Sequence, residues 1–311
     1  MKNVIKSVLF VAIFAVSVYI VTYFLIPGED VSKYGVFKAG NYEILSEEKN
    51  SVDIIFLGDS LVYSSVSPME IWNEYGYTTF NCAESAQLTS NAYKQLEVAL
   101  EKQKPKVVMM ESSVLFRDPK NQDIFDKIVY EIKKYLPIIS QHNNWKKYLS
   151  SDTEYKWINY DKGYKYIKIV RPTKNNNRNY MNKKTLTRSI PEENLEAFDK
   201  IVELCKKNNI KLVLMSLPTQ KTWNYDRHNT VKKYAEEKNV DFIDINLEDI
   251  GLDWSVDTRD KGSHVNSYGS KKVSKFIGKY LTDTNLVVDH RDDSKYKLWN
   301  ESYKLYKKIN N

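Results

Sequence analysis

The sequence predicts a three-layer α/β/α fold, in which a parallel five-stranded sheet lies between two layers of helices. Short apolar runs, each of a length typical of a buried strand, recur along the chain. Longer amphipathic segments separate these runs, and glycine or proline marks several of the boundaries. Because strands that alternate with helices form parallel sheets covered on both faces, these observations favour one α/β domain.

Three strands and two helices are predicted before residue 111, in the order strand 52–57, helix 68–75, strand 77–81, helix 87–102 and strand 106–110. The first strand is an apolar run too short for a helix, and Gly58 ends it. The longer helix has an apolar stripe that includes Ala92 and Leu96, and Pro105 lies just beyond its end. The third strand is rich in Val and Met.

Three helices and two strands are predicted after residue 190, in the order helix 191–208, strand 210–217, helix 226–238, strand 240–245 and helix 267–281. Pro191 suits the first position of its helix, and Leu195, Phe198 and Ile201 share one face of it. The two strands complete the alternation of strands with helices.

A long insertion, at about 119–190, separates the two halves of the domain. From Lys120 to Ile190 there are 16 Lys and Arg against 6 Asp and Glu, and the segment also carries Trp145, Trp157 and eight tyrosines. A loop this long is a functional cap or a disordered excursion, and the aromatic content favours a cap. Its rings and cations suit a glycan or an anionic polymer, while a basic cap packed by its own tyrosines is the alternative.

The amino terminus predicts a membrane anchor. Val8–Ile26 is a stretch of 19 residues without a charge, long enough for a helix to cross the hydrocarbon layer. Lys2 and Lys6 precede it, and positive flanks stay on the cytoplasmic side. No small-x-small cleavage site follows, which favours an uncleaved anchor over a signal peptide. We therefore expect a single-pass anchor in 1–29 and a main domain, 30–284, outside the cytoplasm.

Composition excludes several classes of function. The two cysteines, Cys82 and Cys205, form neither a metal-binding spacing nor a disulfide framework, and we expect two buried free thiols. The formal charge of +7 favours anionic partners. Because a domain outside the cytoplasm does not meet ATP, NAD or genomic DNA, we predict no cofactor, no metal and no nucleic-acid partner.

Ser60 is the first candidate for chemistry. It follows Gly58-Asp59, directly after the first predicted strand and at the start of a helix. A serine nucleophile needs such an exposed turn beside a base, and the positive end of a helix favours a developing oxyanion. An Asp/Ser helix cap after a strand is the alternative interpretation.

His264 is the second candidate, and it is one of four histidines in the chain. It lies after the fifth strand and before the last helix, at the edge of the sheet where catalytic groups collect in such folds. Its loop contains two carboxylates, Asp260 and Asp257, either of which can hold the imidazole tautomer. Together with Ser60, this loop predicts a serine hydrolase.

These residues resemble the SGNH/GDSL hydrolase superfamily, in which a nucleophile lies near the amino end and an Asp-x-x-His block near the carboxyl end. Gly58-Asp59-Ser60-Leu61 matches the first block, and the resemblance covers about 52–281. It implies a three-layer, flavodoxin-like fold, a Ser–His–Asp triad of Ser60, His264 and an aspartate, and ester chemistry without a cofactor.

Three departures from the family concern the acid and the oxyanion hole. The family acid lies three residues before the histidine, where this chain has Lys261, so Asp260 has to act through a loop expanded by one residue, with Asp257 as the alternative. At the position of the family glycine this chain has Ala83, whose N–H serves as well as a glycine N–H. The family asparagine is absent from the third block, which runs Glu111-Ser112-Ser113.

The expected oxyanion hole therefore consists of the Ser60 and Ala83 amides, with Gln87 or Ser112 as an additional donor. Losing one side-chain donor costs on the order of 3 kcal/mol of transition-state stabilisation, which fits a weak hydrolase or an enzyme that requires a particular acyl donor. We assign Asp59, together with His142 and Trp145 of the insertion, to substrate binding.

The departures and the anchor are similar to those of a subset of the superfamily, namely membrane-anchored proteins of alginate O-acetylation and teichoic-acid D-alanylation. This resemblance implies a cell-surface polysaccharide or anionic glycopolymer as substrate and a multi-spanning membrane acyltransferase as partner.

The amphipathic tail, 285–311, has tyrosines and a tryptophan at near-helical spacing with lysines between them. It either lies on membrane lipid or packs on its own domain.

We therefore predict a serine O-acyltransferase or carboxylic ester hydrolase that acts on acyl esters, above all O-acetyl esters, of a polysaccharide at the cell membrane. The alternatives are transfer of a D-alanyl group to a teichoic acid and a non-catalytic partner of a membrane acyltransferase that keeps the fold.

Overall fold

The structure is a computed structural model that describes residues 2–25, 43–119, 160–173 and 179–310. The chain separates into two units, one of residues 1–48 and 120–159 and the other of residues 49–119 and 160–311. Each unit is described by itself. The second contains the whole sheet and all of the candidate site residues that the structure describes.

The sheet consists of five parallel strands in the order β2-β1-β3-β4-β5, which confirms the predicted architecture. The strands are β1 (Ile54–Gly58), β2 (Thr79–Ala83), β3 (Val107–Glu111), β4 (Lys211–Ser216) and β5 (Asp241–Asp244). Each lies within two residues of its predicted bounds at every end. The order changes direction between β1 and β3, and such a switch point is where α/β proteins bind their ligands.

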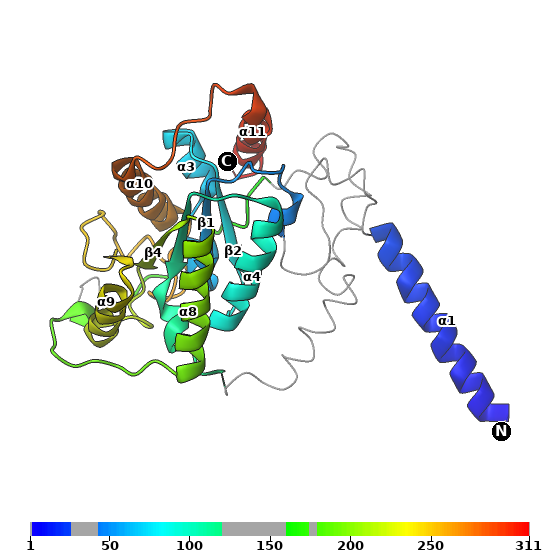
Figure 1. The fold of residues 1–311 in the computed structure, drawn as a ribbon. Helices are drawn as coiled ribbons and strands as arrows, with labels where there is room; N and C mark the ends of the chain where they lie inside the picture. The colour runs from blue at the N-terminus through cyan, green and yellow to red at the C-terminus, as the bar shows by residue number, and fades with distance from the viewer. Residues whose placement is uncertain (1, 26–42, 120–159, 174–178, 311) are drawn as a thin grey trace. The chain divides into compact units, whose positions relative to one another are not determined.

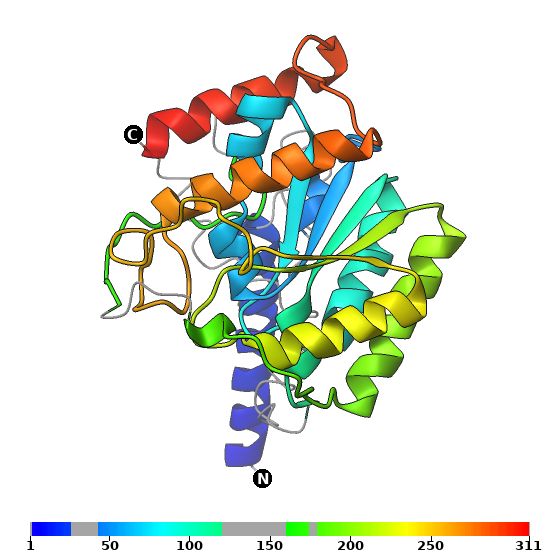
Figure 2. The ribbon, with the colours of Figure 1, turned by 90° about the vertical axis from the view of Figure 1, so that its left-hand side faces the viewer.

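Helices cover both faces of the sheet (Figure 1). They are α2 (Ser60–Ser65), α3 (Pro68–Tyr75), α4 (Thr89–Lys102), α8 (Glu192–Lys207), α9 (Tyr225–Lys238), α10 (Ser267–Thr284) and α11 (Lys297–Asn310), with short 3-10 turns at η3 (Ser112–Phe116), η6 (Asn179–Met181) and η7 (Ser294–Tyr296). Helices α4 and α8 pack side by side, while α10 contacts α2 and α3. In Figure 2, α10 crosses in front of the strands and α11 runs beside α3.

Side chains that alternate along the strands explain the layers. Phe56, Met109 and Val213 belong to one core cluster with Val62 of α2 and Val273 of α10. The intervening strand residues point to the opposite face and are equally buried. A strand with both faces covered is largely apolar, which is why the central strands β1 and β3 appear in the sequence as apolar runs.

The carboxyl end of the insertion returns to the edge of the sheet. The Asn81 N–H of β2 donates to the Lys162 carbonyl at 3.0 Å. Gly163 has φ 83°, and a Cβ there would lie 2.4 Å from the Asn81 carbonyl oxygen, so this close approach requires glycine. Residues 160–164 thus cover the outer edge of β2.

The carboxyl tail packs on its own domain. The Trp299 ring of α11 lies 5.5 Å from the Trp72 ring of α3, and the Trp72 indole N–H donates to the Asn300 side chain. Trp299 and Tyr306 are buried. Of the two interpretations of 285–311, packing on the domain is therefore the one observed for the aromatic face of this helix.

The first unit contains helix α1 (Lys2–Leu25) and the short 3-10 turn η2 (Glu43–Ser46). In the described ranges, no helix has both the length and the apolar character that crossing a membrane requires. The anchor predicted at Val8–Ile26 is not supported by this finding.

Candidate active site

The end of β1 presents Ser60 at the carboxyl edge of the sheet. Gly58 permits the turn, because a Cβ at this position would lie 2.5 Å from Val62 and 2.7 Å from the Cβ of Glu111. Asp59 caps helix α2, and its carboxylate accepts a hydrogen bond from the Leu61 N–H at 2.9 Å. Ser60 is consequently the first residue of α2, with its side chain only partly buried.

Folding brings Ser60, His264 and Asp260 together although 204 residues separate the serine from the histidine. Ser60 Oγ lies 2.8 Å from His264 Nε2, and His264 Nδ1 lies 2.5 Å from Asp260 Oδ2. The other oxygen of Asp260 accepts the His264 backbone N–H at 2.7 Å. The carboxylate thus fixes both the ring and the backbone of the histidine.

These partners determine the tautomer of His264. An ionised carboxylate has no proton to donate, so Nδ1 must carry the hydrogen that binds Asp260. In the neutral imidazole, Nε2 then holds a lone pair and accepts the Ser60 hydroxyl proton. This is the arrangement in which a histidine removes the proton of a serine nucleophile.

Two left-handed residues explain how Asp260 reaches the ring from four positions upstream. Lys261 has φ 62° and Gly262 has φ 88°, so the chain makes a tight loop between the aspartate and the histidine. Thr258 holds this loop, because its hydroxyl donates to the His264 carbonyl and accepts the Gly262 N–H. The one-residue expansion relative to the SGNH pattern is therefore absorbed by the backbone.

The second candidate acid, Asp257, faces another partner. Its buried carboxylate lies 2.6 Å from the Lys272 ammonium and accepts the Asp253 N–H at 2.7 Å. Asp260 has an exposed side-chain fraction of 34% against 1% for Asp257. The structure therefore places Asp260, and not Asp257, against His264.

The backbone donors of the predicted oxyanion hole differ in their placement. Ser60 N–H lies at the start of α2, beside its own hydroxyl. The Glu84 N–H donates to the Gly58 carbonyl of β1, and N–H groups alternate along a strand, so the Ala83 N–H points to the side of β2 away from β1. The register therefore does not direct the Ala83 amide toward the strand that bears Ser60.

The turn after β2 offers another donor, which the sequence did not indicate. Ala86 has φ 57°, a left-handed conformation that residues with a Cβ rarely adopt. Gln87 holds this turn, since its side-chain carbonyl accepts the Glu84 N–H at 2.8 Å and its amide donates to Gln95. Among the described residues, the Ala86 N–H donates no hydrogen bond. The Gln87 side-chain amide, which the sequence analysis named as an additional oxyanion donor, thus holds the turn in place instead.

Ser112, the other additional donor from the sequence, is occupied elsewhere. Its hydroxyl is fully buried and donates its only proton to the Met215 carbonyl of β4 at 2.9 Å. The hydroxyl thus ties β3 to β4.

Asp59 belongs to a buried charge cluster beneath the site. Its second oxygen lies 2.5 Å from an Arg117 guanidinium nitrogen, so its carboxylate is paired within the protein. Glu111, at the end of β3, is fully buried. Burial, and then the nearby negative charge of Asp59, raise the pKa of Glu111 from 4.5 to about 8, against hydrogen bonds from Ser113. Glu111 is therefore protonated at neutral pH.

Other sequence predictions lie elsewhere or outside the described residues. His142 and Trp145, assigned to substrate binding, fall in 120–159, which the structure does not describe. Within the described residues, no group of three or more His, Cys, Asp or Glu side chains could hold a metal ion. Cys82 and Cys205 are buried free thiols, as expected. Arg117 supports the site from a distant segment and Thr258 from within the loop of Asp260 and His264, and no sequence pattern marks either residue.

No protein-family model matches this chain, and no curated protein does. Among solved structures, it is similar to a lipase/acylhydrolase from Enterococcus faecalis, with 11% identity over 75% of this chain and 96% of that chain and a TM-score of 0.41. It is also similar to a psychrotrophic esterase from Pseudoalteromonas sp. (13% identity, 74% and 94% of the two chains, TM-score 0.39). A family 3 carbohydrate esterase from Clostridium thermocellum shows 14% identity over 75% and 96%, with a TM-score of 0.37.

Proposed function

We propose that the protein is a serine esterase or acyltransferase in which Ser60, His264 and Asp260 form the triad. The observation that carries the proposal is the continuous chain of contacts from Ser60 Oγ through His264 to Asp260, at 2.8 and 2.5 Å. The carboxyl end of β1 brings Ser60 to one edge of the sheet, and the loop before α10 brings Asp260 and His264 to the same edge. A serine, a histidine base and a carboxylate in this order activate a hydroxyl for attack on an acyl carbon.

In the first half of the reaction, Ser60 Oγ attacks the carbonyl carbon of an ester, and its proton passes to His264 Nε2. The imidazolium that forms is stabilised by Asp260, which keeps the Nδ1 proton. When the tetrahedral intermediate collapses, the bond to the alcohol oxygen breaks and Nε2 returns the proton to that oxygen. The acyl group is then an ester of Ser60.

Backbone amides stabilise the oxyanion of this intermediate. Ser60 N–H lies next to the reacting hydroxyl, at the positive end of α2. Ala86 N–H, in the turn that Gln87 holds, is our candidate for the second donor because it has no acceptor among the described residues. A hole made of amides alone has fewer donors than one with an asparagine side chain, which fits modest turnover on simple esters.

In the second half, water or a sugar hydroxyl attacks the acyl-enzyme, and His264 again takes the proton. Water gives an esterase, and a sugar hydroxyl gives a transferase. We propose acetyl esters of an extracytoplasmic polysaccharide as the natural donors or products, supported by the aromatic and basic composition of the insertion at 119–190. A polysaccharide acceptor should lower acetate release and gain acetyl groups in the same reaction.

The test of the proposal is covalent labelling. A fluorophosphonate probe should label the wild-type protein at Ser60, as peptide mass spectrometry locates it, and Ser60→Ala should not be labelled. Ser85→Ala, which removes another hydroxyl at the same edge of the sheet, should be labelled like the wild type. Wild-type protein that stays unlabelled and releases no acetate from p-nitrophenyl acetate would refute the enzyme and leave a scaffold with this fold.

The cellular placement is a separate proposal, which rests on the amino-terminal sequence and its flanking lysines. We propose that the second unit works outside the cytoplasm, at the membrane, with membrane lipid and a multi-spanning acyltransferase as neighbours. Protease added to intact cells should digest this unit. Full protection until the cells are lysed would contradict the placement and would leave the triad chemistry unaffected.

A further inference from the structure

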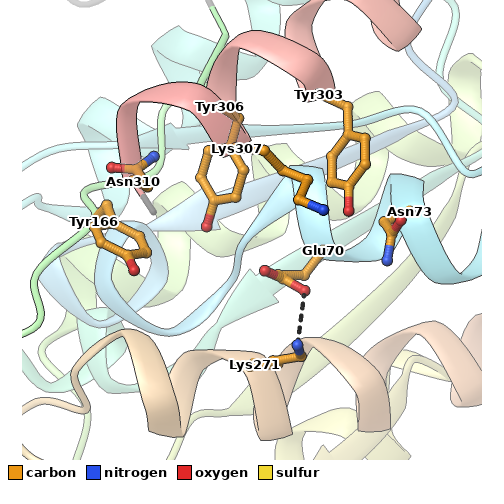
Figure 3. Close-up of a pocket in the computed structure, with 8 residues that line it drawn as sticks. All are labelled: Glu70, Asn73, Tyr166, Lys271, Tyr303, Tyr306, Lys307 and Asn310. Atoms are coloured by element: carbon orange, nitrogen blue, oxygen red, sulfur yellow. Dashed lines mark ion pairs between the residues drawn. The ribbon is translucent and has the colours of Figure 1, made fainter.

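A cavity of about 490 Å³ lies between α3, α10 and α11, apart from the triad. Its lining residues come from four segments of the second unit and are drawn in Figure 3: Glu70, Asn73, Tyr166, Lys271, Tyr303, Tyr306, Lys307 and Asn310. The volume falls within the range of small-molecule sites, which is roughly 300–1,000 Å³. None of these residues takes part in the proposed reaction.

Tyrosine rings form one side of the cavity. The ring of Tyr306 packs edge-on against that of Tyr166, with centroids 6.0 Å apart, and both contact the buried Tyr164. In Figure 3, Tyr303 and Tyr306 point from α11 toward Glu70. Burial raises the pKa of Tyr306 and of Tyr303, and the charge of Glu70 acts in the same direction. The phenols therefore stay protonated and can donate hydrogen bonds.

Charged and amide groups form the rest of the lining. Lys271 lies 3.8 Å from the Glu70 carboxylate, and Lys307 lies over the Tyr303 ring at 5.9 Å. Two ammonium groups against one carboxylate leave the cavity with a net positive charge. Flat rings, amides that both donate and accept, and ammonium groups are the side chains that meet sugar C–H faces, hydroxyls and carboxylates, respectively.

One segment of the chain connects this cavity to the triad. Lys165, next to Tyr166, donates its backbone N–H to the Tyr63 carbonyl of α2, the helix that begins at Ser60. Farther along, the Arg171 carbonyl accepts the N–H of Lys261, between the two triad residues of the loop. Five residues of extended chain span at most about 18 Å, so the cavity and the triad lie at the two ends of a short path.

This path is basic. Lys165, Lys168 and Arg171 are exposed, and the Lys165 ammonium lies over the Tyr63 ring at 4.3 Å. An acidic chain that leaves the cavity toward Ser60 would therefore meet positive charge along its way.

We propose that this cavity is a binding subsite for an acidic oligosaccharide, which it holds while a distant acyl group of the same chain reaches Ser60. The inference rests on the proposed function and names its substrate class: a glycan of uronic-acid type, recognised by ring stacking on tyrosines and by the ammonium groups of Lys271 and Lys307. The subsite separates polymer recognition from the chemistry, so a small acetyl ester does not need it.

The experiment is calorimetric titration of Ser60→Ala protein with tetragalacturonate, in low salt. The uncharged probe is the fully methyl-esterified tetragalacturonate, which has the same sugar rings without the carboxylates. We expect binding of the acid and a weakening of about tenfold or more for the ester, since each factor of ten corresponds to about 1.4 kcal/mol of lost interaction. Because the Ser60→Ala protein lacks the proposed nucleophile, neither probe is turned over during the titration.

Variants in the same background locate the site. Lys271→Ala combined with Lys307→Ala should weaken binding of the acid about tenfold, and Tyr303→Ala should weaken binding of both probes. Lys304→Ala, which removes an exposed charge of the same helix outside the cavity, is the matched control and should bind like the parent. Unchanged thermal unfolding of each variant shows that α11 stays docked.

The proposal is overturned if tetragalacturonate does not bind, if its ester binds equally well, or if Lys304→Ala weakens binding as much as the double lysine variant. These outcomes are independent of the proposed chemistry, because fluorophosphonate labelling of Ser60 does not need the cavity. Conversely, binding that depends on Lys271 and Lys307 in a protein that resists labelling would support the subsite and reject the enzyme.

Discussion

Of the three histidine–aspartate pairs that the structure describes in this domain, two join Nδ1 of the ring to the carboxylate and differ in their surroundings, whereas the third joins Nε2 of His290 to Asp53. His264 Nδ1 lies 2.5 Å from Asp260, and His228 Nδ1 lies 2.8 Å from Asp244. The carboxylate of the first pair is 34% exposed, and that of the second is 2% exposed. The second ring nitrogen of His264 meets Ser60, whereas His228 packs its ring against Tyr225 and Phe242.

The difference lies in how many groups share the carboxylate. Asp244 also accepts the Trp223 indole N–H at 2.9 Å and both the backbone and side-chain N–H groups of Asn246. These hydrogen bonds attach the end of β5 to its neighbouring loops. Asp260 accepts hydrogen bonds from the backbone and ring of His264, and the Arg259 guanidinium lies 3.9 Å from the same carboxylate. We therefore expect catalysis from the His264 pair, whose far ring nitrogen has a hydroxyl partner, and not from the His228 pair.

The largest expected effect is that of exchanging each histidine for glutamine. His264→Gln removes the base and should lower kcat for p-nitrophenyl acetate by about 10⁴-fold or more, whereas His228→Gln should change kcat by less than about threefold. Steady-state kinetics on the purified variants checks this pair. A comparable loss in both variants would mean that the two pairs differ in surroundings but not in role.

The matching exchange of the carboxylates should separate activity from stability. Asp260→Asn should lower kcat by about 10³ to 10⁴-fold, because the amide favours the wrong imidazole tautomer, with little change in unfolding. Asp244→Asn should leave kcat almost unchanged and lower the free energy of unfolding by about 1–3 kcal/mol, because buried donors lose an acceptor. Urea unfolding and kinetics on the same samples decide between the two patterns.

Glu111 extends the comparison to a fully buried carboxyl group that forms no ion pair within the described part of the chain. With a pKa of 4.5 in the unfolded chain and about 8 in the folded protein, it binds a proton only in the folded state between those pH values. Its contribution to stability is therefore complete below pH 4.5 and is lost as pH rises to about 8, by about 1.4 kcal/mol per pH unit.

Glu111→Gln should remove this pH dependence, because the amide does not titrate. The measurement is the difference in unfolding free energy between variant and wild type at pH 5, 6, 7 and 8, which should grow in favour of the variant. A difference that stays constant across this range would show that Glu111 is ionised in the folded protein.

The smallest effects concern the loop that brings Asp260 to His264. Gly262→Ala places a Cβ 2.6 Å from the Gln220 side chain at φ 88°, and it should cost about 1–2 kcal/mol of stability and reduce kcat. Lys261→Gly relieves the left-handed lysine and should change stability by less than about 1 kcal/mol, because the flexible unfolded chain offsets the gain. Thermal unfolding ranks the two; a destabilised Lys261→Gly would show that the lysine side chain itself holds the loop.

The sequence predicted the sheet, its order of elements and the meeting of Ser60 with His264, because unbroken apolar runs and chain order determine these features. It left Asp260 and Asp257 unresolved, since the choice depends on the backbone angles of Lys261 and on the distant Lys272. The hydrogen-bond directions of the Ala83 N–H and the Ser112 hydroxyl could not be predicted for the same reason. The direction of an N–H depends on strand register, and the partner of Ser112 is a carbonyl of β4.

The covered outer edge of β2 has a consequence for solubility. An open strand edge invites pairing with a second molecule, and hence polymerisation. Here the Lys162 carbonyl accepts the N–H of Asn81 in β2. Gly163 packs closely against Asn81, which leaves no room for another strand at this edge. At the opposite side, β5 is only four residues long and begins with Asp241, which pairs with Lys211. Both edges of the sheet are thus poor templates for pairing with a second molecule.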